Sequence, residues 1–133
     1  MGFVLIFVTG ALQLAALLGV GALVCRAARV TASWVALGWC GFAAFLVIAQ
    51  LAHLFFPLGS WFAPAMLAVS ALGWRDVWRA RPRDGVGLSM AVMALASLAA
   101  LAPAEARDNG LYFIQATLWA RDFAAVPGLA NLH

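Results

Sequence analysis

The sequence from residue 3 to residue 25 reads FVLIFVTGALQLAALLGVGALVC and contains no charged side chain. As an α-helix rising about 1.5 Å per residue it would be about 35 Å long, enough to cross a hydrocarbon core about 30 Å thick. Met1 and Gly2 supply none of the basic residues that begin a cleaved signal segment. We therefore predict that this stretch is a membrane-spanning helix that is retained in the protein.

The composition of the whole chain also predicts lipid as its main solvent. Of 133 residues, 66% are hydrophobic and 10% are charged, and the mean hydropathy is +1.00. Soluble domains average about 45–50% apolar and about 25% charged residues, so this chain has too few charged side chains to build a polar exterior. The net charge of +3 comes from arginines gathered mainly in two short stretches. Because they form no basic face with interleaved aromatic residues, we expect no nucleic-acid partner.

Three further stretches are apolar enough to cross a membrane and are separated by short connections: residues 33–56, 58–74 and 85–101. The stretch 58–74 is close to the minimum length for a span, so it either crosses the membrane or enters and leaves on one side. Pro64 lies near its start, where a missing backbone N–H is tolerated. We predict an all-α integral membrane protein in which residues 1–104 form a bundle of four transmembrane helices, with sequential helices antiparallel.

The arginines orient this predicted bundle through the positive-inside rule. They lie in the connections after the first and third stretches: Arg26 and Arg29, then Arg75, Arg79, Arg81 and Arg83. Both connections should face the cytoplasm, which places both termini and the turn at residues 57–60 outside. Many alanines, with arginine in place of lysine, suggest a GC-rich bacterial or phage genome. We expect a multi-pass protein of the bacterial inner membrane.

The tryptophans agree with this orientation, because indole rings prefer the level of the lipid headgroups. Trp34, Trp74 and Trp78 fall at the expected inner boundary, and Trp61 falls at the outer one. Arginine beside tryptophan at the inner leaflet suits anionic headgroups. We expect headgroup contacts from the third connection and its flank: Trp74, Arg75, Trp78, Arg79, Arg81 and Arg83.

The chain becomes more polar after residue 104. Residues 111–125 have apolar side chains near helical spacing, but the stretch is shorter than a span. Crossing the membrane would also bury Gln115, Arg121 and Asp122. We therefore predict that residues 105–133 form an external interfacial helix and tail, lying on the membrane surface or against a partner.

Three polar side chains inside the predicted spans are candidate site residues: Gln13, Gln50 and His53. Gln50 and His53 are about one helical turn apart on the same face, so we expect an intramembrane polar contact between them. Residues 49–53, with Trp61 beyond them, resemble the pattern of small residues before His in bacterial light-harvesting helices. That resemblance implies a bacteriochlorophyll or haem ligated by His53.

Small residues recur at every fourth position in the first two stretches, where they let helix backbones approach closely. These ridges are Ala11, Ala15 and Gly19 in the first stretch, and Ala36, Cys40 and Ala44 in the second. We expect them to pack helices together within the monomer or against a partner. Cys25 and Cys40 have neither CxxC spacing nor a neighbouring His, so we interpret them as core residues and not as metal ligands.

The sequence predicts neither an enzyme nor an ion-coupled transporter. The four predicted spans contain no Asp, Glu, Lys or Arg, unlike the small multidrug transporters with their membrane-embedded Glu. We expect no catalytic residue, no metal and no resident cofactor. The predicted function is an accessory or scaffold subunit of a membrane assembly, in contact with lipid and with other subunits or itself. The alternatives are a self-assembling pore that resembles holins in size and hydropathy, and the haem or pigment carrier described above.

Overall fold

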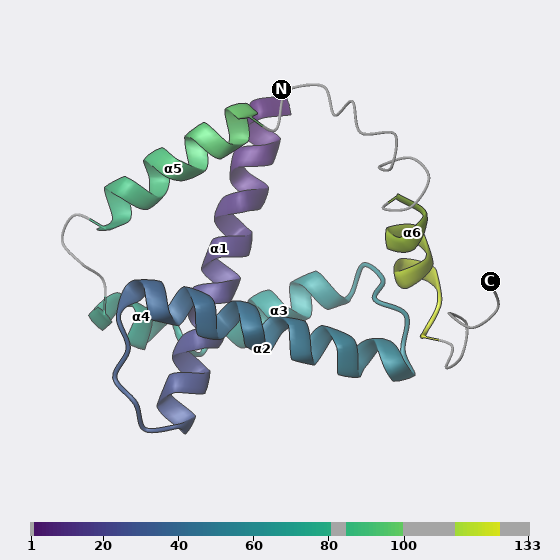
Figure 1. Ribbon diagram of the computed structural model, residues 1–133, viewed down its shortest axis with the longest axis horizontal. Helices are drawn as coiled ribbons and strands as arrows, with labels where there is room; N and C mark the ends of the chain where they lie inside the picture. The colour runs from purple at the N-terminus through teal and green to yellow at the C-terminus, as the bar shows by residue number, and fades with distance from the viewer. Residues whose placement is uncertain (1, 81–84, 100–113, 126–133) are drawn as a thin grey trace.

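A computed structural model describes residues 2–80, 85–99 and 114–125 of the chain. All regular secondary structure in these residues is helical, as expected for an all-α protein. The helices in chain order are α1 (Gly2–Ala27), α2 (Trp34–Phe55), α3 (Phe62–Ala71), α4 (Trp74–Ala80), α5 (Gly85–Ala99) and α6 (Ile114–Asp122) (Figure 1).

The first two helices agree closely with the first two predicted spans in position and length. Ser33 caps α2, because its hydroxyl oxygen accepts a hydrogen bond from the N–H of Ala36 at 3.3 Å. At the other end Pro57 disfavours helical backbone at Phe56, which is extended. Among the described residues, α1 and α2 are the two helices long and apolar enough to cross a membrane, judged by length and composition.

α1 ends in a Schellman turn around Arg29. The N–H of Val30 donates to the carbonyl of Cys25 at 2.9 Å, and the N–H of Arg29 donates to the carbonyl of Arg26 at 3.1 Å. Arg29 has a φ of 56°, a left-handed conformation that glycine adopts freely. For an L-residue with a side chain it costs about 1–2 kcal/mol. This turn reverses the chain so that α2 can fold back against α1.

The third predicted span differs in the structure. Instead of one helix over residues 58–74, the chain forms α3, of 10 residues, and then the separate α4. The two meet at Leu72 and Gly73, where the N–H of Gly73 donates to the carbonyl of Ser70, three residues back, at 2.9 Å. Gly73 contacts the backbone of α1 at this point, which explains why the helix bends there. α3 alone is about 15 Å long, roughly half the thickness of a hydrocarbon core.

α1 lies at the centre of the arrangement (Figure 1). α2 crosses it steeply on one side and α3 contacts the other side, while the C-terminal part of α5 contacts the N-terminal half of α1. The fourth predicted span, residues 85–101, is described as α5 up to Ala99. Of the four predicted spans, the structure thus shows two as long apolar helices, α1 and α2, which cross at a steep angle (Figure 1). These two helices touch through glycines, and their closest contact lies at this crossing point.

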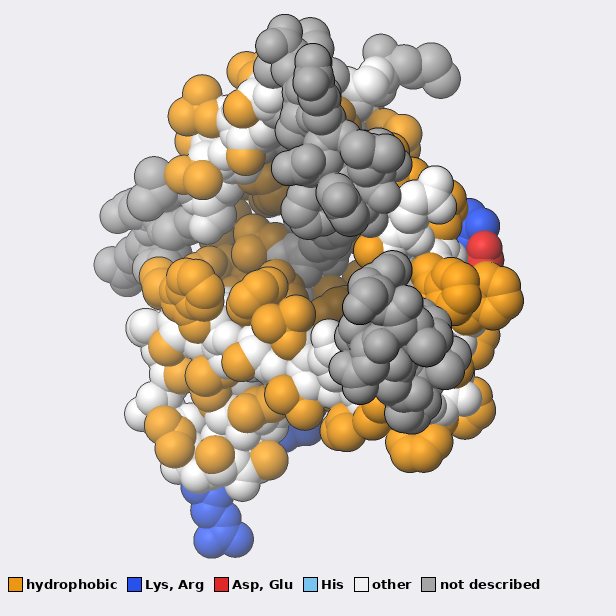
Figure 2. All heavy atoms as spheres, turned by 45° about the vertical axis from the view of Figure 1, so that its right-hand side comes forward, with side chains coloured by type: hydrophobic (Ala, Val, Ile, Leu, Met, Phe, Trp, Pro, Cys, Tyr) orange, Lys and Arg blue, Asp and Glu red, His pale blue; other side chains and the backbone are white. Residues whose placement is uncertain are grey.

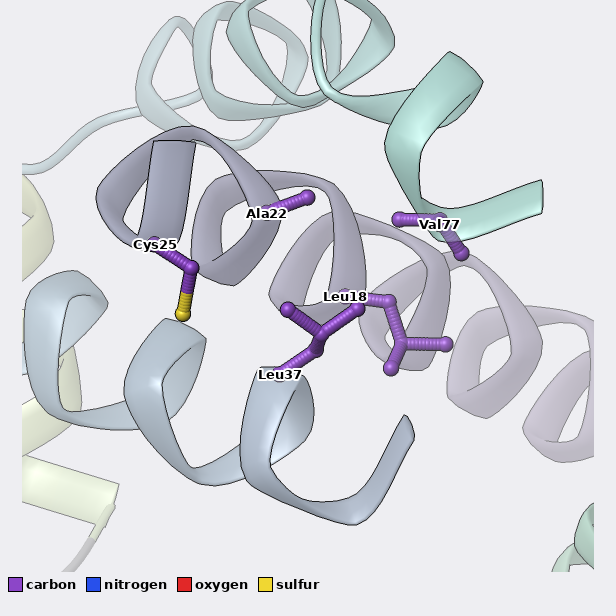
Figure 3. Packing of buried hydrophobic residues seen from close by; sticks show 5 residues of the cluster. All are labelled: Leu18, Ala22, Cys25, Leu37 and Val77. Carbon is purple, nitrogen blue, oxygen red and sulfur yellow. The ribbon is translucent and has the colours of Figure 1, made fainter. Parts of the chain in front are cut away.

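The described part of the chain has a small buried core at this crossing. One cluster joins Leu18, Ala22 and Cys25 of α1 to Leu37 of α2 and Val77 of α4, and Figure 3 shows these side chains between the three helices. A second cluster contains Val20, Phe62 and Met66. The core therefore lies where α1 meets its neighbours, and most of the remaining helix surface is outside it.

Much of the apolar surface is exposed, as the spread of hydrophobic side chains in Figure 2 shows. Leu5 is 69% exposed, Trp39 is 68% exposed and Phe55 is 72% exposed. Within the most apolar window of each long helix, 22% of the residues of α1 and 11% of those of α2 are buried. The core helix of a soluble protein would be mostly buried. This exposure therefore separates α1 and α2 from such a helix.

Candidate functional site

Two glycines bring α1 and α2 into direct backbone contact. A Cβ placed on Gly21 would overlap the carbonyl oxygen of Leu37 and lie 2.9 Å from the nitrogen of Gly41. A Cβ placed on Gly41 would overlap the carbonyl oxygen of Leu17 and lie 3.0 Å from the nitrogen of Gly21. The contact is reciprocal, so each helix presents a glycine to a carbonyl of the other. Such Cα–H to carbonyl contacts recur where helices approach closely.

A second glycine contact joins the opposite side of α1 to α3 and α4. A Cβ on Gly19 would overlap the carbonyl oxygen of Ser70, and a Cβ on Gly73 would overlap the carbonyl oxygen of Gly19. Gly19 and Gly21 are two residues apart, which is about 200° around a helix with 3.6 residues per turn. They therefore face opposite sides of α1. This short segment fixes α1 between two neighbouring helices.

The predicted small-residue ridges take part in this packing to different degrees. Gly19 is buried at the contact with α3, while the other five members of the ridges are half-buried: Ala11, Ala15, Ala36, Cys40 and Ala44. The closest approach is made by Gly21, Gly41 and Gly73, which the ridge pattern missed. The sequence did contain a signal for these positions, namely glycines inside helical stretches. Glycine inside a helix costs about 1 kcal/mol relative to alanine, so its presence there indicates a place where two backbones touch.

The two cysteines lie on either side of the same crossing. Both are free thiols, and Cys40 packs against the cluster that contains Cys25. The interpretation of both as core residues agrees with this placement, since Cys25 is buried and Cys40 is half-buried.

His53 lies near the C-terminal end of α2 and is half-buried. Its Nδ1 is enclosed and has no hydrogen-bond partner within the described ranges. Gln50 is exposed, so the expected hydrogen bond from Gln50 to this nitrogen is not formed. Gln13 is also exposed and lines a groove between α1 and α5. The part of the chain that the structure describes contains no group of three His, Cys, Asp or Glu side chains that would hold a metal ion.

α6 is held beside the connection between α2 and α3 by two backbone hydrogen bonds. The N–H of Leu58 donates to the carbonyl of Ala120 at 2.8 Å, and the N–H of Ala125 donates to the carbonyl of His53 at 2.7 Å. None of the residues Ile114–Asp122 is buried. Within the stretch 111–125, which was predicted to be helical, the structure thus has the short helix α6, and its apolar side chains, including Leu118 and Trp119, are exposed.

A charged pair closes α6. The guanidinium of Arg121 donates two hydrogen bonds to the carboxylate of Asp122, at 2.7 and 2.8 Å. This hydrogen bonding holds the pKa of Asp122 below its usual value and raises that of Arg121. Both side chains are exposed, so the pair keeps its charges in solvent and does not enter the apolar surface.

The arginine-bearing end of the molecule brings together two connections that are far apart in the sequence. The Nη1 of Arg26 lies 3.4 Å from Oδ2 of Asp76, and the Nη1 of Arg79 lies 4.0 Å from Oδ1 of the same carboxylate. A groove of about 370 Å³ opens beside this cluster. Of the other predicted headgroup residues, Arg75 and Trp78 are exposed and Trp74 is half-buried. Arg81 and Arg83 lie outside the described residues.

Comparison with known proteins places the chain in one family. Residues 3–133 match the model of the family described as Domain of unknown function (DUF8201), and the chain belongs to it. No curated protein and no solved structure matches the chain.

Proposed function

We propose that this protein is a non-catalytic integral membrane protein that serves as an accessory or scaffold subunit of a larger membrane assembly. The observation that carries the proposal is the exposed apolar surface of α1 and α2. Few residues of these helices are buried in the monomer, although both are strongly apolar. In water such a surface would drive aggregation, whereas lipid and partner helices cover it without cost.

The polar groups of the apolar helices support a lipid environment. The hydroxyl of Thr9 donates to the carbonyl of Leu5 at 2.8 Å, and that of Ser97 donates to the carbonyl of Met93 at 2.7 Å. The hydroxyl of Ser70 donates within α3 to Leu67 at 2.7 Å. Each hydroxyl is thus satisfied by its own helix, as required where no water is present to bond it.

The steep crossing of α1 and α2 fits a bilayer if both helices tilt. Spanning helices tilt by up to about 40° from the membrane normal. At that tilt α1, about 39 Å long, still covers about 30 Å, and α2, about 33 Å long, covers about 25 Å. Opposite tilts then produce the steep crossing while both helices stay within the apolar layer.

The arrangement of the connections supports the predicted orientation. Arg26 and Asp76 bring the first and third connections to one end of the core, and this arginine-rich end faces the cytoplasm in our proposal. α6 lies beside the α2–α3 connection, and both face outside. This orientation in the bacterial inner membrane places the exposed α6 at the outer headgroups.

One face of α2 suits a partner helix. Four large exposed side chains lie at alternating spacings of four and three residues: Val35, Trp39, Phe42 and Leu46. This is the spacing of a helix-packing seam. The rings of Trp39 and Phe42 lie edge to face, with centroids 6.1 Å apart, and form the bulkiest part of the seam. Aromatic residues of this kind contribute most to interfaces when they are buried by a partner.

The proposal is tested by cross-linking in native membranes, purification in mild detergent, and mass spectrometry of the bound proteins. We expect another membrane protein at fixed stoichiometry. Truncating Trp39 and Phe42 together to Ala should lower its recovery by about tenfold or more. The matched control, Val47→Ala with Leu51→Ala, removes two exposed side chains from another face of α2 and should leave recovery unchanged.

Two results would contradict the accessory-subunit proposal. A homo-oligomer alone, together with dye release from vesicles that contain it, would establish the pore. A Soret or bacteriochlorophyll band in the purified protein that disappears in His53→Ala would establish a cofactor carrier.

A further inference from the structure

The groove between the C-terminal end of α1 and α4 is built for an amphiphilic anion. We propose that it binds the phosphate of an anionic membrane phospholipid, with the headgroup at Arg26 and Arg79 and an acyl chain along the apolar wall. This inference rests on the proposed location of the protein in a membrane. It adds a specific site and a ligand class to that proposal.

The charges in the groove leave an excess of positive charge. Arg26 and Arg79 share a single carboxylate, that of Asp76, at 3.4 and 4.0 Å. The carboxylate holds two guanidinium groups near each other, although like charges at this separation would repel without it. The shared carboxylate neutralises one of the two cations. A phosphate that binds between the guanidiniums would complete the charge balance.

Hydrogen-bond donors remain for such a phosphate. A guanidinium carries five N–H donors. The contacts described for Arg26 use its Nη1, which lies 3.4 Å from Asp76 and 3.5 Å from the carbonyl of Leu72. The side chains of Arg26 and Arg79 are 58% and 65% exposed, so the rest of each guanidinium is accessible from the membrane surface.

Apart from Thr31, the rest of the groove is lined by apolar side chains. Its lining continues from the charged cluster along small and aliphatic side chains of α1, the α1–α2 connection, α2 and α4: Ala22, Val30, Ala32, Leu37 and Ala80. An inorganic anion would gain nothing from such a wall, whereas an acyl chain would bury methylene groups against it and be stabilised by the hydrophobic effect. The combination of a cationic mouth and an apolar wall therefore favours a lipid over a free phosphate.

The backbone conformation of Arg29 is independent support for the view that positive charge is needed beside the groove. Arg29 occupies a left-handed position that glycine would fill without strain, and it follows the groove residue Arg26 by three residues. A cation thus occupies a strained backbone position beside the groove. The attraction of a basic residue to an anionic surface is of the same order as the strain of this backbone conformation and offsets it.

The test is native mass spectrometry of the full chain in a neutral detergent. It is titrated with phosphatidylglycerol, with phosphatidylcholine of the same acyl chains, and with inorganic phosphate. We expect selective binding of phosphatidylglycerol and little binding of phosphate. Arg79→Gln and Arg26→Gln should each weaken phosphatidylglycerol binding by about tenfold. Arg75→Gln is the matched control, because it removes the same charge from α4 at a residue that does not line the groove.

Three outcomes would overturn the inference. If Arg75→Gln weakened phosphatidylglycerol binding as much as the groove variants do, the attraction would be diffuse and not specific to the groove. If the wild type bound phosphatidylglycerol no better than phosphatidylcholine, there would be no site for an anionic headgroup. If inorganic phosphate bound as tightly as phosphatidylglycerol, the site would be one for a free anion. Membrane insertion of the wild type is measured separately by flotation of vesicles. If insertion persists while selectivity is absent, this inference fails and the proposed function stands.

Discussion

At the scale of the single residue, Arg29 combines two opposing effects. Its left-handed backbone is strained for any residue with a Cβ, yet its charge lies just beyond the C-terminus of α1, where cations interact favourably with the helix dipole. Arg26, in the last turn, adds a second cation at the same helix end. The charge of Arg29 is therefore favourable at this end of the molecule, whereas its side chain is unfavourable for the left-handed backbone of the turn.

We predict that Arg29→Gly and Arg29→Ala separate these two effects. Both variants remove the charge, but only glycine relieves the left-handed backbone. Arg29→Gly should therefore be more stable than Arg29→Ala by about 1 kcal/mol, measured by thermal unfolding of the full chain in detergent. Equal stability of the two variants would mean that the turn does not hold Arg29 at a positive φ.

The candidate residues were predictable from sequence to different extents. The polarity of His53 within an apolar helix singled it out, but its environment did not follow from spacing. Gln50 shares its helix face, yet it remains exposed while the Nδ1 of His53 is enclosed. A spacing of one turn places two side chains on one face, and their rotamers and the neighbouring backbone decide whether they meet.

At the scale of the helix, the contact between α1 and α2 depends on the absence of side chains. Gly21 and Gly41 let each backbone touch the other, and this explains why one crossing point dominates. The ridge pattern identified the right helices but centred the contact on alanines. Alanine and glycine are both small, and only the crossing geometry decides which positions admit no Cβ at all.

We predict that Gly41→Ala disrupts this crossing and that Gly38→Ala does not. A Cβ at Gly41 would overlap backbone atoms, which cannot move aside, so the variant should lose about 1–3 kcal/mol of stability. At Gly38 the nearest atom is the Cδ2 of Leu18 at 4.0 Å, so alanine fits there and should be neutral or stabilising by up to about 1 kcal/mol.

The natural cysteines provide the measurement for this pair of variants. Because Cys40 of α2 packs against the cluster that contains Cys25 of α1, we expect copper–phenanthroline as oxidant to join the two thiols in an intramolecular disulfide. We expect rapid loss of both free thiols in the wild type and in Gly38→Ala, and slower loss in Gly41→Ala. Equal rates in all three proteins would show that Gly41 does not set the distance between the helices.

The positions of the long helices α1 and α2 were predictable, and the division between the short helices α3 and α4 was not. α1 and α2 follow from uninterrupted apolar sequence, a serine cap and a following proline, all of which act locally. The division of residues 58–74 into α3 and α4 depends on the contact between Gly73 and Gly19, which are far apart in the sequence. A tertiary contact of this kind leaves no local pattern, so apolar length alone suggested a single helix.

At the scale of the whole molecule, the organisation follows from α1. It contacts α2, α3, α4 and α5, and the buried core lies along it. The apolar surface that this arrangement leaves exposed is the basis of the proposed membrane location. The same arrangement gathers positive charge at one end and places α6 beside the α2–α3 connection. These features together favour a subunit that presents helix surface over one that encloses a reaction site.

Membrane integration of the full chain tests this account most directly. Membranes from cells that express the protein are washed with alkaline carbonate and then floated through a density gradient. Flotation separates inserted protein from aggregates, which sediment. We predict that the chain stays with the floating membranes after the wash. Recovery of the chain as a monomeric, folded protein in the carbonate supernatant would contradict the account, because it would show that α1 and α2 do not require lipid.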